Sequence, residues 1–227
     1  MNCGILVQEP GSLCPACWKN ITFLKAPSCF ACGYPFEFDI GSQALCLTCS
    51  TKRPPYHRAR AAMVYDDYSS HPILSFKHGD RTENSKAFAR WLLHSGKDLI
   101  QDADYIIPVP LHWKRLFSRR YNQAAMIAVE MGRISGKPVL TQSLIRHKIT
   151  PSQGQKSRAE RIKNVKNAFA ISPKSIQMIH EKNILLIDDV MTTGATISAC
   201  AKTLLSAGVK KVDVLTLARI VRPGQMP

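Results

Sequence analysis

The sequence predicts an α/β protein, in which a parallel sheet is flanked by helices, with a small cysteine-rich module at the N-terminus. Two observations support this prediction. Seven of the eight cysteines lie before residue 50. After the paired prolines 54–55, short apolar runs alternate with amphipathic segments, which is typical of a parallel sheet covered by helices on both faces. We therefore assign residues 1–53 to the module and 54–227 to the α/β domain.

The module contains three Cys-x-x-Cys pairs, at 14–17, 29–32 and 46–49. Two residues between thiolates allow both sulfurs to bind one tetrahedral zinc from a tight turn, and four thiolates leave no open position, so such a site is structural. Reduced buried thiols or redox pairs would explain a single pair better than a series of three. The first choice for one zinc is the set Cys29, Cys32, Cys46 and Cys49. Cys3, Cys14 and Cys17 predict a second site, which is degenerate unless a further cysteine precedes residue 1.

The α/β domain is expected to contain four strands and three helices. Apolar runs predict the strands at 59–65, 105–109, 183–187 and 212–217, and helical spacing of apolar residues predicts the helices at 83–99, 122–134 and 195–206. Residues 146–166 are polar and basic without a clear apolar period. A stretch of this kind inside a compact domain is more often a functional flap than a filler, so we interpret it as a flap.

Residues 184–196 form the most informative motif, in which an apolar run ends in two aspartates and a Thr-rich loop leads into a helix. Carboxylates at the end of a central strand can accept hydrogen bonds from ribose hydroxyls. Backbone N–H groups at a helix start, with threonine hydroxyls, favour a phosphate, and a glycine permits the tight turn. An ordinary acidic helix start would explain only the aspartates. The predicted ligands of a phosphorylated ribose are Asp188, Asp189, Met191, Thr192, Thr193, Gly194, Ala195 and Thr196.

These residues resemble the phosphoribosyl pyrophosphate (PRPP) signature of type I phosphoribosyltransferases. The wider pattern resembles the ComF family of competence proteins in particular, through 107–112 (Ile-Pro-Val-Pro-Leu-His), 119–124 (Arg-Arg-Tyr-Asn-Gln-Ala), Thr150, Gln153, Arg161, Asn164 and 168–169 (Ala-Phe). The resemblance implies the type I phosphoribosyltransferase fold and PRPP as ligand, with magnesium. It also implies a part in natural transformation, through the handling of single-stranded DNA and contact with other competence proteins.

The resemblance also implies roles for two further segments. The turn Val109, Pro110, Leu111 and His112 would contact pyrophosphate, with Arg115, Arg119 and Arg120 neutralising it. The family usually has glycine where this chain has Arg120, and such a position often needs a positive φ angle. A flap at about 146–166, with Thr150, Gln153 and Arg161, would close over PRPP and exclude water, unless the segment is a disordered basic loop.

The charge of the chain is strongly basic and unevenly distributed. The formal net charge is +15, and residues 112–166 contain thirteen Lys or Arg against two Glu. This block predicts polyanionic partners, either pyrophosphate or nucleic acid or both, unless it is simply a solvated face. The candidate DNA contacts are Lys114, Arg119, Arg120, Lys156 and Arg158. No apolar run approaches the roughly 20 residues that span a bilayer. The N-terminus lacks a signal-peptide pattern, so we expect a cytoplasmic protein without membrane insertion.

Three functions remain open from the sequence. The chain could be an active phosphoribosyltransferase with an unidentified acceptor, a competence factor that binds PRPP as a non-catalytic regulator, or an enzyme of nucleotide or cofactor metabolism with no DNA role. No acceptor-binding segment and no catalytic residue can be identified. Most aromatic side chains of the module are expected to fill the core around zinc rather than to stack on DNA bases.

Overall fold

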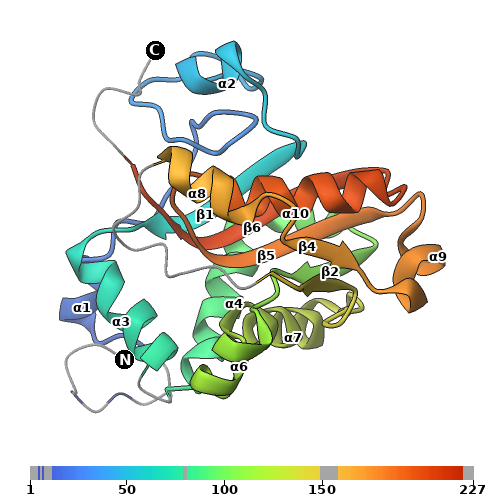
Figure 1. Ribbon diagram of the computed structural model, residues 1–227. Coiled ribbons are helices and arrows are strands. Elements are labelled where there is room, and N and C mark those ends of the chain that lie inside the picture. Colours follow the sequence, from blue (N-terminus) through green and yellow to red (C-terminus); the bar gives the residue numbers. More distant parts are fainter. Residues whose placement is uncertain (1–4, 6, 8–11, 79–80, 149–157, 222–227) are drawn as a thin grey trace.

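The computed structural model describes residues 5, 7, 12–78, 81–148 and 158–221. Its centre is a four-stranded parallel sheet in the order β1-β6-β5-β2 (Figure 1). The strands are β1 (Arg58–Val64), β2 (Tyr105–Pro108), β5 (Asn183–Met191) and β6 (Lys211–Arg219). Every residue of β6 after Lys211 is buried, as expected for a central strand with both faces covered.

Helices cover the two faces of this sheet separately. Below the sheet in Figure 1 lie α4 (Asn84–Ser95) and α7 (Gln123–Ser135), and above it lie α8 (Arg158–Val165) and α10 (Ala195–Ser206). Each face has its own apolar cluster, one around Phe88 and Leu92 and the other around Ile197 and Leu204. The α/β fold predicted from the sequence is therefore confirmed.

Shorter elements complete the chain. They are α1 (Pro15–Lys19), α2 (Leu47–Thr51), α3 (Asp67–His78), α5 (Lys97–Asp102), α6 (Trp113–Arg119), the antiparallel pair β3 (Leu144–Arg146) and β4 (Phe169–Ile171), the 3-10 turn Pro173–Ser175 and α9 (Ile176–Ile179). Among the helices of the described residues, none is long and apolar enough to cross a bilayer.

Most predicted elements are found within two residues of their expected ends, with three differences. The single helix expected at 83–99 is wrong, because Gly96 (φ −123°) interrupts it and packs so closely on Leu215 that a Cβ would lie 2.7 Å from that side chain. The strand expected to end at residue 187 continues to Met191 through ladder pairing with β6, so the two aspartates lie within it. Helix α8 forms in the segment interpreted as an irregular flap, where the burial of Val165 anchors it.

The cysteine-rich module packs along the free edge of β1. The Leu24 N–H donates to Ala62 O (2.9 Å), and the Val64 N–H donates to Thr22 O (2.9 Å). Further along, the Ala59 N–H donates to Ala31 O (2.8 Å). These bonds cover an edge that would otherwise present unpaired backbone groups to solvent. The module is thus attached to the sheet through the main chain as well as through side chains.

Candidate functional site

The two aspartates of the 184–196 motif lie at the carboxyl end of β5, between β2 and β6. Both side chains are half-buried, and the Asp189 N–H donates to Asp188 Oδ1 (2.9 Å). Desolvation, followed by the neighbouring charge of Asp189, raises the pKa of Asp188 to about 7. Neither acid has an arginine within ion-pair distance among the described residues, so this end of the strand holds negative charge at a cost.

The loop after the aspartates leads into the N-terminus of α10. Gly194 adopts a left-handed conformation (φ +72°) as the residue before the helix, and because it has no side chain it makes no capping hydrogen bond to α10. The Thr193 hydroxyl is buried and makes no hydrogen bond within the described residues. A helix start preceded by glycine, with an unsatisfied hydroxyl beside it, is typical of an anion site.

Lys77 reaches this site from the last turn of α3, and no motif in the sequence indicated it. Its Nζ lies 2.9 Å from Asp189 Oδ2, with both side chains mostly buried. The backbone around Lys77 is held by the segment after α6, since Gln123 Nε2 donates to Lys77 O (3.4 Å) and Tyr121 Oη donates to Phe76 O (2.6 Å). An ion pair between residues so far apart in the chain leaves no sequence pattern.

The expected pyrophosphate turn lies beside the aspartates. Val109 follows β2 and donates its N–H to Ile187 O (2.8 Å), directly before the acid pair. Asn122 fixes the turn from the other side, because its Nδ2 donates to Val109 O (3.0 Å) while its Oδ1 caps α7. His112 is buried and caps α6 by accepting the Lys114 N–H (3.2 Å). Pro110 and Leu111 connect Val109 to His112.

Arg120 has a φ angle of +66°, in the left-handed region. The family usually has glycine at this position, which can adopt this region without the steric cost of a Cβ. Non-glycine residues occupy this region uncommonly, and doing so costs about 1 kcal/mol or more. The turn at Arg120 therefore holds an arginine in a strained backbone conformation.

Three arginines of α6 and β3 lie near one another, since the charge of Arg119 acts on Arg115 and the charge of Arg115 acts on Arg146. Arg115 and Arg119 are half-buried on α6, and Arg146 on β3 is 6% exposed. Burial lowers the pKa of Arg115, and the charge of Arg119 lowers it further. Burial followed by the charge of Arg115 lowers the pKa of Arg146, while Asp188 opposes this shift. Crowded, desolvated cations are unfavourable until an anion joins them.

The flap residues fall largely outside the described part of the chain. Thr150, Gln153 and Lys156 lie there, and for Arg158 and Arg161 the structure describes only the backbone, in α8. The segment leaves from β3 and returns to β4, since His147 N–H donates to Ala168 O (3.1 Å) and the two strands pair from Leu144 to Ile171. The flap therefore starts and ends at one hairpin base, next to Arg146.

A groove of about 1630 Å³ extends from the Thr-rich loop along the outer face of α10 to the cysteine-rich module. Its lining includes Thr193, Ser198, Lys202, Lys52 and Arg53. The groove therefore adjoins the Thr-rich loop that follows Asp188 and Asp189. Basic side chains line it both on α10 and on the cysteine-rich module.

The four predicted zinc ligands come together in the module. The sulfurs of Cys29, Cys32, Cys46 and Cys49 all lie within 4.8 Å of one another, and Cys32 Sγ is 3.7 Å from Cys46 Sγ. Four sulfurs at about 2.3 Å from a tetrahedral zinc would be roughly 3.8 Å apart, so the set fits this metal. These cysteines form a zinc-binding cluster of the structural type, as predicted.

The knuckle around Cys32 is shaped by contact with the sheet. Gly33 has a φ angle of +67°, and a Cβ there would lie 2.5 Å from Ala59 O. Arg60 donates to Phe30 O (3.0 Å), and Arg219 donates to Cys32 O. Of the second predicted set, Cys14 and Cys17 are buried around α1, where Cys17 N–H donates to Cys14 Sγ (3.5 Å), and Cys3 lies outside the described residues.

The aromatic side chains of the module divide between two places. Tyr34 is buried in the cysteine cluster, and Phe36 packs against it. Trp18 and Phe23 instead meet Trp91 of α4 edge-to-face. Phe38 and Trp18 are 75% and 47% exposed.

Comparison with known proteins accounts for both halves of this arrangement. Residues 1–50 match the family model described as a double zinc ribbon domain. Competence protein F of Haemophilus influenzae is 30% identical over 221 residues, covering 95% of this chain and 94% of the relative. The chain belongs to the competence protein F (ComF) family. DNA utilization protein YhgH of Salmonella typhimurium is 28% identical over 222 residues, covering 96% and 88% of the two chains.

Among solved structures, orotate phosphoribosyltransferase from Aeropyrum pernix aligns with 70% of this ComF-family chain and 68% of its own, at 17% identity and a TM-score of 0.39. The residues matched by the double zinc ribbon model, 1–50, precede the parallel sheet, whose first strand begins at Arg58.

Proposed function

We propose that this ComF-family protein binds PRPP at the carboxyl end of β5 and supports natural transformation by handling single-stranded DNA. The observation that carries the proposal is the proximity of opposite charges, since the charges of Asp188 and Arg115 both act on Arg146. The acid pair Asp188–Asp189 lies near the end of β5, before the start of α10, and the arginines Arg115, Arg119 and Arg146 come from α6 and β3.

The arrangement suits the two ends of PRPP differently. Ribose hydroxyls would donate to the carboxylates of Asp188 and Asp189, while the 5′-phosphate would meet the N–H groups from Thr192 to Thr196. The pyrophosphate would lie toward Val109–His112 and the arginines, whose desolvation cost an anion would offset. Magnesium would arrive on the pyrophosphate, because Lys77 already engages the Asp189 carboxylate.

The DNA part of the proposal is supported by the names of the relatives and by charge. One relative is called a competence protein and another a DNA utilization protein. The basic block that supplies most of the net charge includes α6 and the flap. Of the proposed DNA contacts, Lys114 and Arg120 are exposed, whereas Arg119 is half-buried and donates to Gln123 Oε1 (3.5 Å).

Calorimetry with PRPP and magnesium tests the ligand. The double variant Asp188→Asn, Asp189→Asn should lose detectable binding, and Asp67→Asn, an exposed carboxylate on α3, should bind as the unmodified protein does. Unchanged affinity in the double variant would refute the ribose assignment. Single-stranded DNA added to the same titration, at two salt concentrations, measures the second activity, because phosphate contacts make affinity fall with salt.

Turnover is a separate question with a direct measurement. Pyrophosphate release from PRPP in the presence of candidate amines would identify a transferase. Tight PRPP binding without release would identify a protein that uses PRPP as a regulatory ligand. Normal transformation frequency in cells that carry the double variant would contradict the link between the PRPP site and DNA uptake.

A further inference from the structure

Helix α6 has an outer face that the PRPP site does not use. We propose that its exposed aromatic side chains, Trp113 and Phe117 with Lys114 beside them, form a platform on which bases of single-stranded DNA stack. This inference rests on the proposed DNA role and names the surface that performs it. We call Trp113, Leu116 and Phe117 the aromatic face.

The exposure of these side chains is unusual for their size. Trp113 is 64% exposed, Leu116 42% and Phe117 88%, and none of the residues of α6 is buried. Single exposed apolar residues are ordinary on protein surfaces. Three of them at positions i, i+3 and i+4 share one side of a helix, where they form a continuous apolar surface next to the proposed site.

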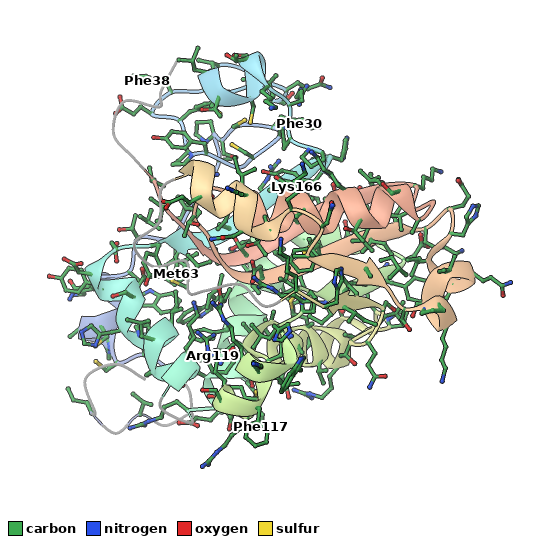
Figure 2. The ribbon with its side chains drawn as sticks, viewed as in Figure 1. Phe30, Phe38, Met63, Phe117, Arg119 and Lys166 are labelled. Atoms are coloured by element: carbon green, nitrogen blue, oxygen red, sulfur yellow. The ribbon has the colours of Figure 1, made fainter. Side chains whose placement is uncertain are left out.

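The direction of the face follows from helix geometry. At about 100° per residue, Trp113 and Phe117 point away from the side that carries Arg115 and Arg119. Figure 2 agrees, since Phe117 projects from the lower edge of the molecule while Arg119 lies toward its interior. The half-burial of Arg115 and Arg119 against the exposure of Phe117 gives the same division. In this proposal, the aromatic face of α6 therefore binds DNA bases and the side with Arg115 and Arg119 binds PRPP.

The charge around the aromatic face favours a polyanion over a protein or a lipid tail. Residues 105–129 contain no Asp or Glu. Lys114 Nζ lies 5.5 Å from the centre of the Trp113 ring, so a cation accompanies the aromatic surface. Among the described residues, no ion pair involves Lys114 or Arg119. Aromatic rings interleaved with cations are the combination that single-stranded nucleic acids bind, with bases on the rings and phosphates on the cations.

The location also links the two proposed ligands. Helix α6 begins directly after His112, so a strand on its outer face would pass about one helix diameter, roughly 10 Å, from the pyrophosphate turn. Duplex DNA cannot use this platform, because its bases are stacked on each other and unavailable to protein rings. The surface thus selects the single-stranded form.

Fluorescence anisotropy with a labelled oligothymidylate tests the platform. Trp113→Ala and Phe117→Ala should each weaken binding about 5- to 100-fold, with the dependence of affinity on salt unchanged, because they remove stacking and no charge. Lys114→Ala should instead lower the slope of log affinity against log salt by about 0.7. Met178→Ala removes an apolar side chain that is 46% exposed on α9, away from α6 in Figure 1, and should have no effect.

PRPP calorimetry on the same variants separates the two faces. The aromatic variants should bind PRPP as the unmodified protein does, and Arg115→Gln should lose PRPP affinity while keeping most DNA affinity. Thermal unfolding of each variant checks that it folds.

Three outcomes would overturn the inference, and they are distinguishable. Oligothymidylate binding that survives both aromatic substitutions would place the strand elsewhere while leaving the proposed function intact. An unmodified protein that binds PRPP but no single-stranded DNA would remove the DNA half of the proposed function and the platform with it. Normal DNA binding with lost transformation would identify the face as a docking surface for a protein.

Discussion

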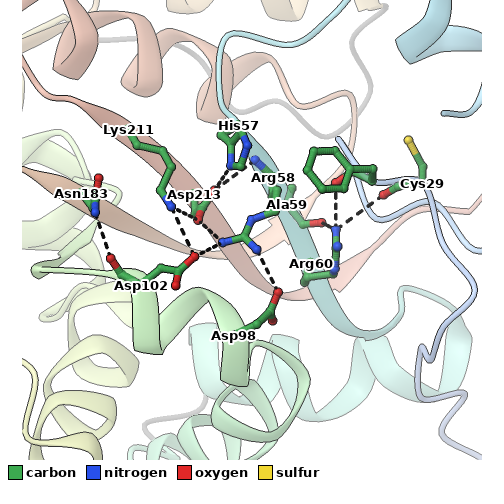
Figure 3. A network of polar contacts seen from close by, with 11 residues as sticks. Cys29, His57, Arg58, Ala59, Arg60, Asp98, Asp102, Asn183, Lys211 and Asp213 are labelled. Carbon is green, nitrogen blue, oxygen red and sulfur yellow. Dashed lines mark hydrogen bonds and ion pairs between the residues drawn. The ribbon is translucent and has the colours of Figure 1, made fainter. Parts of the chain in front are cut away.

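The two ends of the central sheet use charged residues in opposite ways. At the amino end, Arg58 of β1 bonds Asp98 (3.1 Å), Asp102 (2.7 Å) and Asp213 (2.8 Å), and Lys211 and His57 add further contacts to Asp213 (Figure 3). At the carboxyl end, like charges are neighbours: Arg115 lies near Arg119 and Arg146, and Asp188 lies beside Asp189.

The titration of the two ends shows the difference. The Arg58 and Lys211 side chains lower the pKa of Asp102, which favours its charged form. At the other end, the pKa of Asp188 rises and those of Arg115 and Arg146 fall, so each charged form is disfavoured. The amino end therefore contributes to the stability of the fold. The carboxyl end holds charges whose cost a charged ligand can offset, as is common at functional sites.

The largest expected effect comes from breaking the amino-end network. Arg58→Met should cost about 3–5 kcal/mol of unfolding free energy, because Asp213, whose side chain is 3% exposed, loses its main partner in the interior. Urea denaturation measures the loss, with Arg81→Met as control, since Arg81 and Glu83 form an exposed pair at 3.8 Å. A loss below about 1 kcal/mol would contradict the view that this network compensates a buried charge.

At the carboxyl end of the sheet, removing a charged side chain should instead stabilise the folded protein. Asp188→Asn removes a carboxyl whose pKa in the folded protein, about 7, exceeds its ordinary value of 3.8. Ionisation of Asp188 therefore opposes folding fully above pH 7, and this cost declines as the pH falls and the carboxyl takes up a proton.

The Asn variant should consequently gain about 1–3 kcal/mol at pH 8, with the gain shrinking by about 1 kcal/mol per pH unit below 7. Urea midpoints at pH 8 and pH 6 measure this. A variant that is less stable than the unmodified protein at both pH values would mean that Asp188 is a structural residue rather than a strained one.

The smallest expected changes in stability are those caused by replacing Lys77 or Lys211. Lys77→Met should lower stability by about 1 kcal/mol at pH 8, because it leaves two neighbouring carboxylates without their cation, and it should raise the pKa of Asp188 further. Lys211→Met should cost less than about 0.5 kcal/mol, because Asp213 keeps Arg58. Equal losses would contradict the proposed contrast between the two ends. Combining Lys77→Met with Asp189→Asn tests the pairing, since the two effects should not add.

Local sequence patterns predicted the parts of this molecule that depend on nearby residues. The buried strands are continuous apolar runs, and the zinc cysteines have a fixed spacing, so both could be recognised. The break at Gly96 could not be predicted, because it depends on Leu215 from a distant strand.

The charge networks could not be predicted for the same reason. Lys77 meets Asp189, and Arg58 meets Asp213, only after the strands have been ordered in space. The 112–166 block could be identified as basic, yet its division into an inner arginine face and an outer aromatic face of α6 depends on which side of a short helix is covered. Because no residue of α6 is buried, its apolar residues do not show which side of the helix faces the rest of the protein.

Arg219 gives the zinc ribbon a mechanical connection to the Thr-rich loop. It is the last residue of β6, it holds the carbonyl of the zinc ligand Cys32, and its Cα is paired across the sheet with that of Met191, where β5 ends and the loop begins. The Ile220 N–H continues this tie to Met191 O (3.0 Å). The last residue pair of β5 and β6 thus connects a zinc-ligand turn with the start of the Thr-rich loop, so a displacement of one would be transmitted to the other.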